Sequence, residues 1–279
     1  MSQAQLHHGL LVATNYLMSQ LLRALEIDML DAARLRRTFG KYQGEIRFWL
    51  VTTAVVLVTT TAVAQPFSIP SGSMEPTLLV GDRIAANKFV YGYSKFSSPI
   101  GLMPEFKGRL WEGTPERGDI AVFRLPGDPS VNFVKRVIGL PGDRIQMRDG
   151  ELHINGAVVP RRAVGRFTTQ LGEQGTRYVE ELPNGRTHEI IKTVARHELD
   201  DTREFVVPAN SYFMLGDNRD NSADSRVPVE LGGVGFVPAE NLVGRVNRVL
   251  FSLSPFDGWV SAFAHLGELR ISRLLHAVE

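Results

Sequence analysis

The sequence predicts a mainly antiparallel β fold that is preceded by one membrane-spanning helix. Short runs of alternating apolar and polar residues follow one another after residue 66, and Asp-Gly or Asn-Gly pairs separate several of them. Such pairs favour two-residue hairpin turns. Strands do not alternate with long helical patterns, as they would in a parallel sheet. The helix is predicted from residues 48–64, a long run without any charged side chain.

Length and composition narrow the functional classes. The 279 residues suffice for one large domain or two smaller ones. The chain carries 31 basic and 30 acidic residues, so no excess of positive charge favours nucleic-acid binding. It has no cysteine, which excludes disulfides and thiolate metal sites. The seven histidines are scattered along the chain, and we therefore expect neither a metal, a cofactor nor a Ser-His-Asp triad.

Residues 1–47 predict a cytoplasmic helical leader. Two helical patterns follow each other there, but Asn15 and Arg23 interrupt the apolar run. Basic residues cluster between 34 and 47, whereas the next Lys or Arg after the uncharged run is Arg83. By the positive-inside rule, this asymmetry places the N-terminus inside and the rest of the chain on the outer side of the cytoplasmic (inner) membrane.

Residues 48–65 predict the anchor of a single-pass protein that contacts membrane lipids. A helix over this run would cover roughly 25 Å, which is close to the thickness of the hydrocarbon core. Ala62-Val63-Ala64 also has the small-x-small pattern of a cleavage site, so a cleaved signal is the alternative. The long leader favours an uncleaved anchor.

Residues 66–279 predict an outer-face domain of short strands. The stretch at about 149–205 is rich in hairpin signals and predicts a β lobe inserted into this domain. Residues 86–117 lack a clear period and predict a long exposed loop. Hairpin turns are expected at 149–150, 155–156 and 184–185, and strands over 119–123, 133–138, 144–147, 205–207, 212–215 and 243–251.

A segment shortly after the anchor is suited to carry a nucleophile. Ser71, Gly72 and Ser73 lie between Pro70 and Pro76, and this composition breaks any helix. A serine hydroxyl held on such a bend can act as a nucleophile, provided that a base is nearby. Without a base, the same segment is an ordinary loop.

Lys135 is the candidate base. Strand alternation places it on one face with Phe133 and Val137. A lysine in these surroundings is either a surface residue whose ammonium reaches solvent or a desolvated amine with a lowered pKa. A neutral amine is able to activate a serine hydroxyl, as in known Ser-Lys pairs.

A polar loop over residues 216–226 follows the strand predicted at 212–215. It holds three Asp, two Asn, two Arg and two Ser. A solvated loop and a calcium loop are alternatives, although two arginines and the lack of a closing Glu make a poor calcium site. Internal Asp–Arg pairs would make the loop rigid and place one hydroxyl against Lys135.

Four segments, in this order, resemble the sequence boxes of bacterial signal peptidase I, also called leader peptidase. Residues 267–273 resemble the family's ending, and the resemblance covers about residues 45–275. It implies an all-β, partly barrel-like protease domain with an inserted β lobe. The four segments are 71–78 (SGSMEPTL), 117–123 (RGDIAVF), 134–143 (VKRVIGLPGD) and 216–226 (GDNRDNSADSR).

The resemblance also implies roles for the matching residues. Ser73 is expected to be the nucleophile and Lys135 the general base. The Ser71 hydroxyl and the Ser73 N–H are expected to form the oxyanion hole, and Ser222 to orient the Lys135 amine. Structural ion pairs are expected between Asp217 and Arg136 and between Asp224 and Arg226. The substrate pockets are expected from Phe67, Ile69, Pro70, Met74, Leu78, Phe133 and Val134.

The implied activity is removal of N-terminal signal peptides from exported preproteins. Cleavage would follow a small-x-small (Ala-x-Ala) sequence at the outer face of the membrane, through an acyl-enzyme. An extended substrate is able to add as a strand, with alternate side chains in shallow apolar pockets. A related self-cleaving Ser-Lys protease would need a DNA-binding module. The alternative from another class is a non-enzymatic, membrane-anchored binding domain, which cleavage of a preprotein would exclude.

Overall fold

The computed structural model describes residues 42–58, 64–97, 108–253 and 269–278. The chain divides into two units, residues 1–57 and 58–279. The described residues 42–58 are helical. Within the described ranges, no helix has the length and apolar character needed to cross a membrane.

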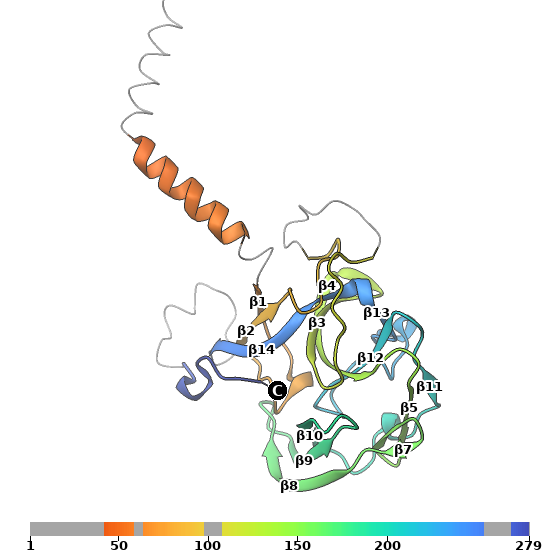
Figure 1. The fold of residues 1–279 in the computed structure, drawn as a ribbon. Helices are drawn as coiled ribbons and strands as arrows, with labels where there is room; N and C mark the ends of the chain where they lie inside the picture. The colour runs from red at the N-terminus through yellow and green to blue at the C-terminus, as the bar shows by residue number, and fades with distance from the viewer. Residues whose placement is uncertain (1–41, 59–63, 98–107, 254–268, 279) are drawn as a thin grey trace, which may run out of the picture. The chain divides into compact units, whose positions relative to one another are not determined.

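The second unit is built from antiparallel sheets, which confirms the predicted mainly β fold (Figure 1). Its largest sheet has seven strands in the order β1-β2-β14-β3-β4-β12-β13. The two edge strands, β1 and β13, do not pair with each other, so hydrogen bonding among the described strands does not close this sheet into a barrel. The strands are β1 (Ala64–Ser68), β2 (Asp82–Asn87), β3 (Ile120–Leu125), β4 (Asp128–Gly139), β12 (Ser211–Leu215), β13 (Val237–Pro238) and β14 (Leu242–Ser252).

Two smaller sheets come from the middle of the chain. One has the order β11-β5-β6-β7 and the other the order β10-β9-β8. Asp149 and Asn155 have positive φ angles of 48° and 55°, as the predicted hairpin turns require. The strands are β5 (Arg144–Arg148), β6 (Glu151–Ile154), β7 (Ala157–Val158), β8 (Arg161–Thr168), β9 (Gln174–Glu181), β10 (Thr187–Lys192) and β11 (Phe205–Val206).

Short 3-10 turns connect these strands. The turn η2 follows β1 and precedes β2, and it contains Ser73. The described turns are η2 (Gly72–Met74), η3 (Glu198–Asp200), η4 (Val229–Leu231), η5 (Ala239–Asn241) and η7 (Ile271–Arg273).

Two sequence-based boundaries need correction. Ala64 and Gln65, predicted as the end of the anchor, pair with Asn87 and Ala86 as part of β1. The loop predicted as exposed over 86–117 begins inside β2, and Tyr91 farther along it is completely buried. Apolar packing and the hydrogen bond from the Tyr91 hydroxyl to Asp119 hold Tyr91 in the core, whereas Phe89, Leu110 and Trp111 of the same stretch are exposed.

Burial along β4 changes at the position of the candidate base. Its first residues, 128–132, are exposed, whereas Lys135 and all later residues of the strand are buried. Apolar clusters pack on either side of β3 and β4, with Ile120 and Val122 in one cluster and Phe123 in another. The polar residues Lys135 and Arg136 therefore begin the buried half of a core strand, where they need partners.

Candidate active site

Ser73 is the middle residue of the turn η2, and an extended residue, Ser71, comes directly before this turn. Ser71 precedes the turn with φ −135° and ψ 154°, and its hydroxyl is 3.4 Å from the Ser73 Oγ. The first N–H groups of such a turn have no acceptor within it. Ser73 itself is 9% exposed. The bend thus presents, at one place, a hydroxyl and N–H donors that have no acceptor within the turn.

Lys135 reaches this bend from β4. Its Nζ donates a hydrogen bond of 2.6 Å to the Ser73 Oγ. The side chain is 2% exposed, and the amine lies 5.4 Å from the centre of the Phe133 ring. Of the two alternatives that the sequence allowed, Lys135 is therefore the desolvated amine.

Burial controls the protonation of Lys135. Desolvation lowers its pKa from 10.5 to about 8, and the positive charge of Arg226 acts in the same direction. Asp224 and Asp217 oppose this effect because their negative charges favour the ammonium form. The result is an amine that is neutral in a substantial fraction of molecules at mildly alkaline pH.

Both predicted ion pairs are present. Arg136 donates two hydrogen bonds of 2.8 Å to Asp217, one to each carboxylate oxygen. Arg226 forms a bidentate pair with Asp224 as well, with one hydrogen bond of 2.8 Å to each carboxylate oxygen. The first pair forms because Arg136 is opposite Leu215 in the sheet, at the end of β12, just before the loop 216–226 begins.

Asn218 is a site residue that sequence reasoning missed. Its backbone N–H donates to the Ser73 carbonyl at 3.1 Å, and its Nδ2 donates to the Gly72 carbonyl at 3.2 Å. The loop 216–226 is therefore attached to the peptide groups that carry the nucleophile. Only the polar composition of the loop hinted at this, since nothing in the sequence distinguishes Asn218 from Asn221.

The predicted hydrogen bond between Ser222 and Lys135 is absent from this structure, in which both residues are described. The Ser222 Oγ lies instead over Gly216, where it would be 2.2 Å from a Cβ built on that glycine. Burial raises the pKa of Asp224, but Arg226, the Gly216 N–H and Ser222 outweigh it and lower the pKa below its usual value. The Ser222 Oγ is buried and has no hydrogen-bond partner among the described residues.

Comparisons with known proteins identify the family of this chain. The family described as signal peptidase, peptidase S26, matches residues 43–251. This chain belongs to the signal peptidase family. Signal peptidase I of Rickettsia typhi is 44% identical over 208 residues, which cover 71% of this chain and 76% of that protein. Signal peptidase I of Rickettsia prowazekii is 43% identical over 208 residues, with the same two shares.

A solved structure of a signal peptidase I from Enterococcus faecalis also matches. It is 29% identical in sequence and covers 47% of this chain and 96% of that chain, with a TM-score of 0.30. Family membership makes this protein a serine endopeptidase that removes signal peptides.

The residues expected to form the substrate pockets of this peptidase differ in how far they are buried. Met74 and Leu78 are 1% and 0% exposed and belong to a closed apolar cluster. Ile69 belongs to the same cluster, and Phe67 and Val134 pack against it while remaining partly exposed. The other two expected residues are Phe133, which packs against a different cluster, and Pro70, which is exposed.

The segment after Ser73 is held by the end of the chain. Arg273 donates to the Thr77 carbonyl at 2.9 Å and binds the buried carboxylate of Asp82. Arg270 donates to the Val80 carbonyl at 3.0 Å. The stretch 267–273 that resembled the family's ending thus binds, through Arg270 and Arg273, the segment that follows Ser73. Gly267 and Glu268 of this stretch lie outside the described residues.

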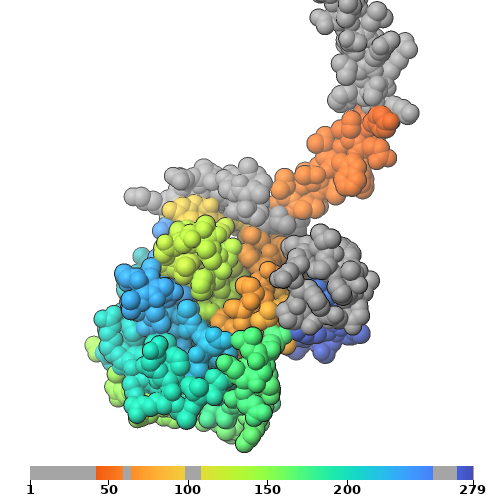
Figure 2. Space-filling view, turned by 180° about the vertical axis from the view of Figure 1, so that it is seen from behind, coloured from red at the N-terminus to blue at the C-terminus, as the bar shows by residue number. Residues whose placement is uncertain are grey.

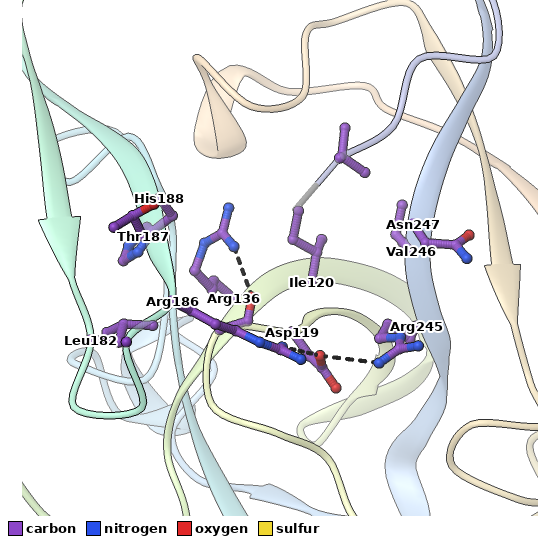
Figure 3. Close-up of a pocket in the computed structure, with 13 residues that line it drawn as sticks. Asp119, Ile120, Arg136, Leu182, Arg186, Thr187, His188, Arg245, Val246 and Asn247 are labelled. Carbon is purple, nitrogen blue, oxygen red and sulfur yellow. Dashed lines mark hydrogen bonds and ion pairs between the residues drawn. The ribbon is translucent and has the colours of Figure 1, made fainter.

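Arg136 also lines a cavity of about 500 Å³ (Figure 3). Asp119 lies on its floor and binds Arg186 at 2.8 Å and Arg245 at 3.5 Å. His188, from β10, forms part of one wall. Because Asp119 pairs with Arg186 and Arg245, and Arg136 pairs with Asp217 outside the cavity, we regard this cavity as part of the scaffold around Arg136.

Gly216 provides a direct test of how tightly the loop packs on the nucleophile. A Cβ at this position would lie 2.2 Å from the Ser222 Oγ and 2.6 Å from the Ser73 carbonyl oxygen. We expect Gly216→Ala to reduce the cleavage rate by roughly a hundredfold, since displacements of about 1 Å have effects of that size. Gly44→Ala, where nothing lies within 4 Å, is the control and should keep the wild-type rate. A Gly216→Ala variant with the wild-type rate would contradict this packing.

Proposed function

We propose that Ser73 is the nucleophile and Lys135 the general base of this signal peptidase. The observation that carries the proposal is the buried 2.6 Å hydrogen bond between the Lys135 Nζ and the Ser73 Oγ. The neutral amine accepts the hydroxyl proton while Oγ attacks the carbonyl carbon of the scissile peptide bond. The resulting ammonium then donates this proton to the leaving amine, and an acyl-enzyme remains on Ser73.

The Ser73 N–H and the Ser71 hydroxyl stabilise the oxyanion in this proposal. Two features support it: the turn η2 leaves its first N–H groups without internal acceptors, and the Ser71 hydroxyl lies 3.4 Å from the nucleophile. A water molecule then attacks the ester carbon and gives a proton to Lys135, the bond to the Ser73 Oγ breaks, and Lys135 returns the proton to this oxygen. The Asp217–Arg136 and Asp224–Arg226 pairs act as scaffold, because all four side chains are buried and bind each other.

The substrate in this proposal is an extended segment with small residues at alternate positions. It adds as a strand beside β1, which is an edge of the seven-stranded sheet and leads into Ser71. Small side chains enter shallow pockets near Ile69, Phe133 and Val134, and the preference for Ala follows from the limited space. Pro70, Met74 and Leu78 support these pockets from behind or at their rim.

Incubation of the purified protein with a preprotein tests this function. We expect a single cut after a small-x-small sequence, identified by sequencing the new N-terminus, and no cut by Ser73→Ala. If the wild type leaves every preprotein intact while it binds them, the alternative of a non-enzymatic binding domain is correct.

We also propose that the uncharged run that begins at residue 48 and ends before β1 anchors the protein in the cytoplasmic membrane, with residues 1–47 inside and the β domain outside. The charge asymmetry around the uncharged run supports this orientation. Protease added to intact spheroplasts should digest the domain after residue 66, whereas a cytoplasmic marker protein should survive. Protection of the β domain under these conditions would mean that the orientation is reversed.

A further inference from the structure

The inserted lobe is joined to the loop that holds the nucleophile. Ile191, in β10, donates its N–H to the Asp217 carbonyl at 2.9 Å and accepts from the Arg219 N–H at 3.1 Å. These bonds form a parallel bridge between Ile191 and Asn218. The loop 216–226 therefore adds to the edge of the β10-β9-β8 sheet as a very short extra strand.

A buried ion pair strengthens this junction. Arg219 is 2% exposed, and it donates to both carboxylate oxygens of Glu180 in β9, at 2.9 and 2.5 Å. Glu180 is fully buried, and the His188 ring lies 3.4 Å from it. Burial raises the pKa of Glu180, but Arg219 and His188 outweigh this effect and bring the pKa to about 2. The carboxylate is thus charged at neutral pH and forms an ion pair with Arg219.

The next residue of the loop is tied to the lobe as well. One carboxylate oxygen of Asp220 accepts the N–H groups of Thr193 and Val194, at 2.7 and 3.0 Å. Its other oxygen binds the Lys192 amine at 2.9 Å. The residues immediately before and after Asn218 are therefore hydrogen-bonded to the lobe. Asn218 itself donates hydrogen bonds to the carbonyls of Gly72 and Ser73.

The lobe touches the nucleophile segment at a second place. Gln170, in the turn between β8 and β9, accepts the Val80 N–H at 2.7 Å, and its own N–H donates to Glu75 at 3.3 Å. In the space-filling view, the green residues of this turn lie against the orange segment that contains Ser73 (Figure 2). Residues from the lobe thus hold the bend both through the loop and directly.

We propose that Glu180 is a positioning residue for the peptidase reaction: through Arg219 it fixes Asn218, and through Asn218 it fixes the peptide groups that carry the Ser73 nucleophile. This inference rests on the proposed function of Ser73. It gives the inserted lobe a role in the chemical step. Glu180 lies in none of the segments that resembled the family's boxes.

Removal of the Glu180 charge is the first test. Glu180→Gln keeps the shape of the side chain but leaves Arg219 without its counter-charge. We expect kcat to fall about ten- to a hundredfold, because small displacements of reacting groups have effects of this size. KM should stay within about twofold of wild type, since the proposed pockets are not touched. Glu181→Gln, at the exposed neighbouring position, is the matched control and should behave as wild type.

A double-mutant cycle with Asn218→Ala separates positioning from simple loss of stability. If Glu180 acts through Asn218, the double variant should be about as slow as the slower single variant. Independent effects on kcat, which multiply in the double variant, would overturn the proposal. All rates are measured per folded molecule, with circular dichroism as the measure of folding.

A second variant, with two uncharged side chains, tests the proposal even if Glu180→Gln does not fold. Glu180→Leu combined with Arg219→Met replaces the buried ion pair with apolar side chains of similar size, which buried pairs often tolerate. This variant should fold and keep a low kcat, because the bidentate ion pair between Glu180 and Arg219 is lost. Recovery of wild-type kcat in it would overturn the proposal. Failure of the wild type to cleave any preprotein would instead reject the proposed function itself.

Discussion

Lys135→Arg should give a folded protein that has lost its activity. The proposed base must be a neutral amine, whereas the arginine guanidinium stays protonated at any usable pH. Loss of a general base typically reduces the rate ~10²–10⁴-fold. The larger guanidinium also has no space where the Lys135 amine lies 2.6 Å from the Ser73 Oγ. The measurement is the initial rate of preprotein cleavage, with circular dichroism to establish folding.

The pH dependence of the wild type completes this test. Because burial lowers the pKa of Lys135 to about 8, the neutral fraction of the amine grows as the pH rises through this value. The rate should therefore increase with pH and level off above about 8, and Lys135→Arg should show no such increase. A folded Lys135→Arg variant that keeps more than roughly a tenth of the wild-type rate would rule out Lys135 as the base.

Asp217→Ala should cause a large loss of stability. The substitution leaves Arg136, which is 1% exposed, without the carboxylate that accepts two of its hydrogen bonds. Removal of one partner of a buried pair costs about 3–5 kcal/mol, because the remaining charge is uncompensated. Thr77 loses a hydrogen bond to the same carboxylate, at 2.5 Å. Denaturant unfolding of the wild type and the variant gives the difference in the free energy of unfolding.

An exposed ion pair provides the control for Asp217→Ala. Glu204 and Arg144 are 3.0 Å apart, and their side chains are 38% and 62% exposed. Glu204→Ala should therefore change the free energy of unfolding by no more than about 1 kcal/mol. Equal effects of the two substitutions would show that burial of the Asp217–Arg136 pair does not matter.

The stability difference between wild type and Asp217→Ala should also depend on pH. Burial raises the pKa of Asp217, but Arg136 and its other hydrogen-bond donors outweigh this effect, and the pKa is lowered below 3.8. A carboxylate with a lowered pKa stabilises the fold above its unfolded pKa, and this contribution is lost as the pH falls through the folded pKa. The difference should accordingly be constant near neutral pH and shrink in acid.

The sequence alone determined the mainly β character, several of the strands and the family of the protein. Strand alternation and Asp-Gly or Asn-Gly turns depend on neighbouring residues, so β5, β6 and the turn between them could be predicted directly. The serine segment, Lys135 and the loop 216–226 were recognised because their boxes occur in the order typical of signal peptidase I. These features are local, or they concern only the order of segments along the chain.

Only the tertiary structure decided how these segments are held together. From the sequence, Lys135 was either a surface residue or a desolvated amine, and its burial beside Ser73 selects the second. The attachment of Asn218 to the Ser73 carbonyl, and of Arg219 to Glu180, had no sequence signal. Such contacts join residues far apart in the chain, and a polar side chain in a loop acquires its buried partner only when the sheets bring the two segments together.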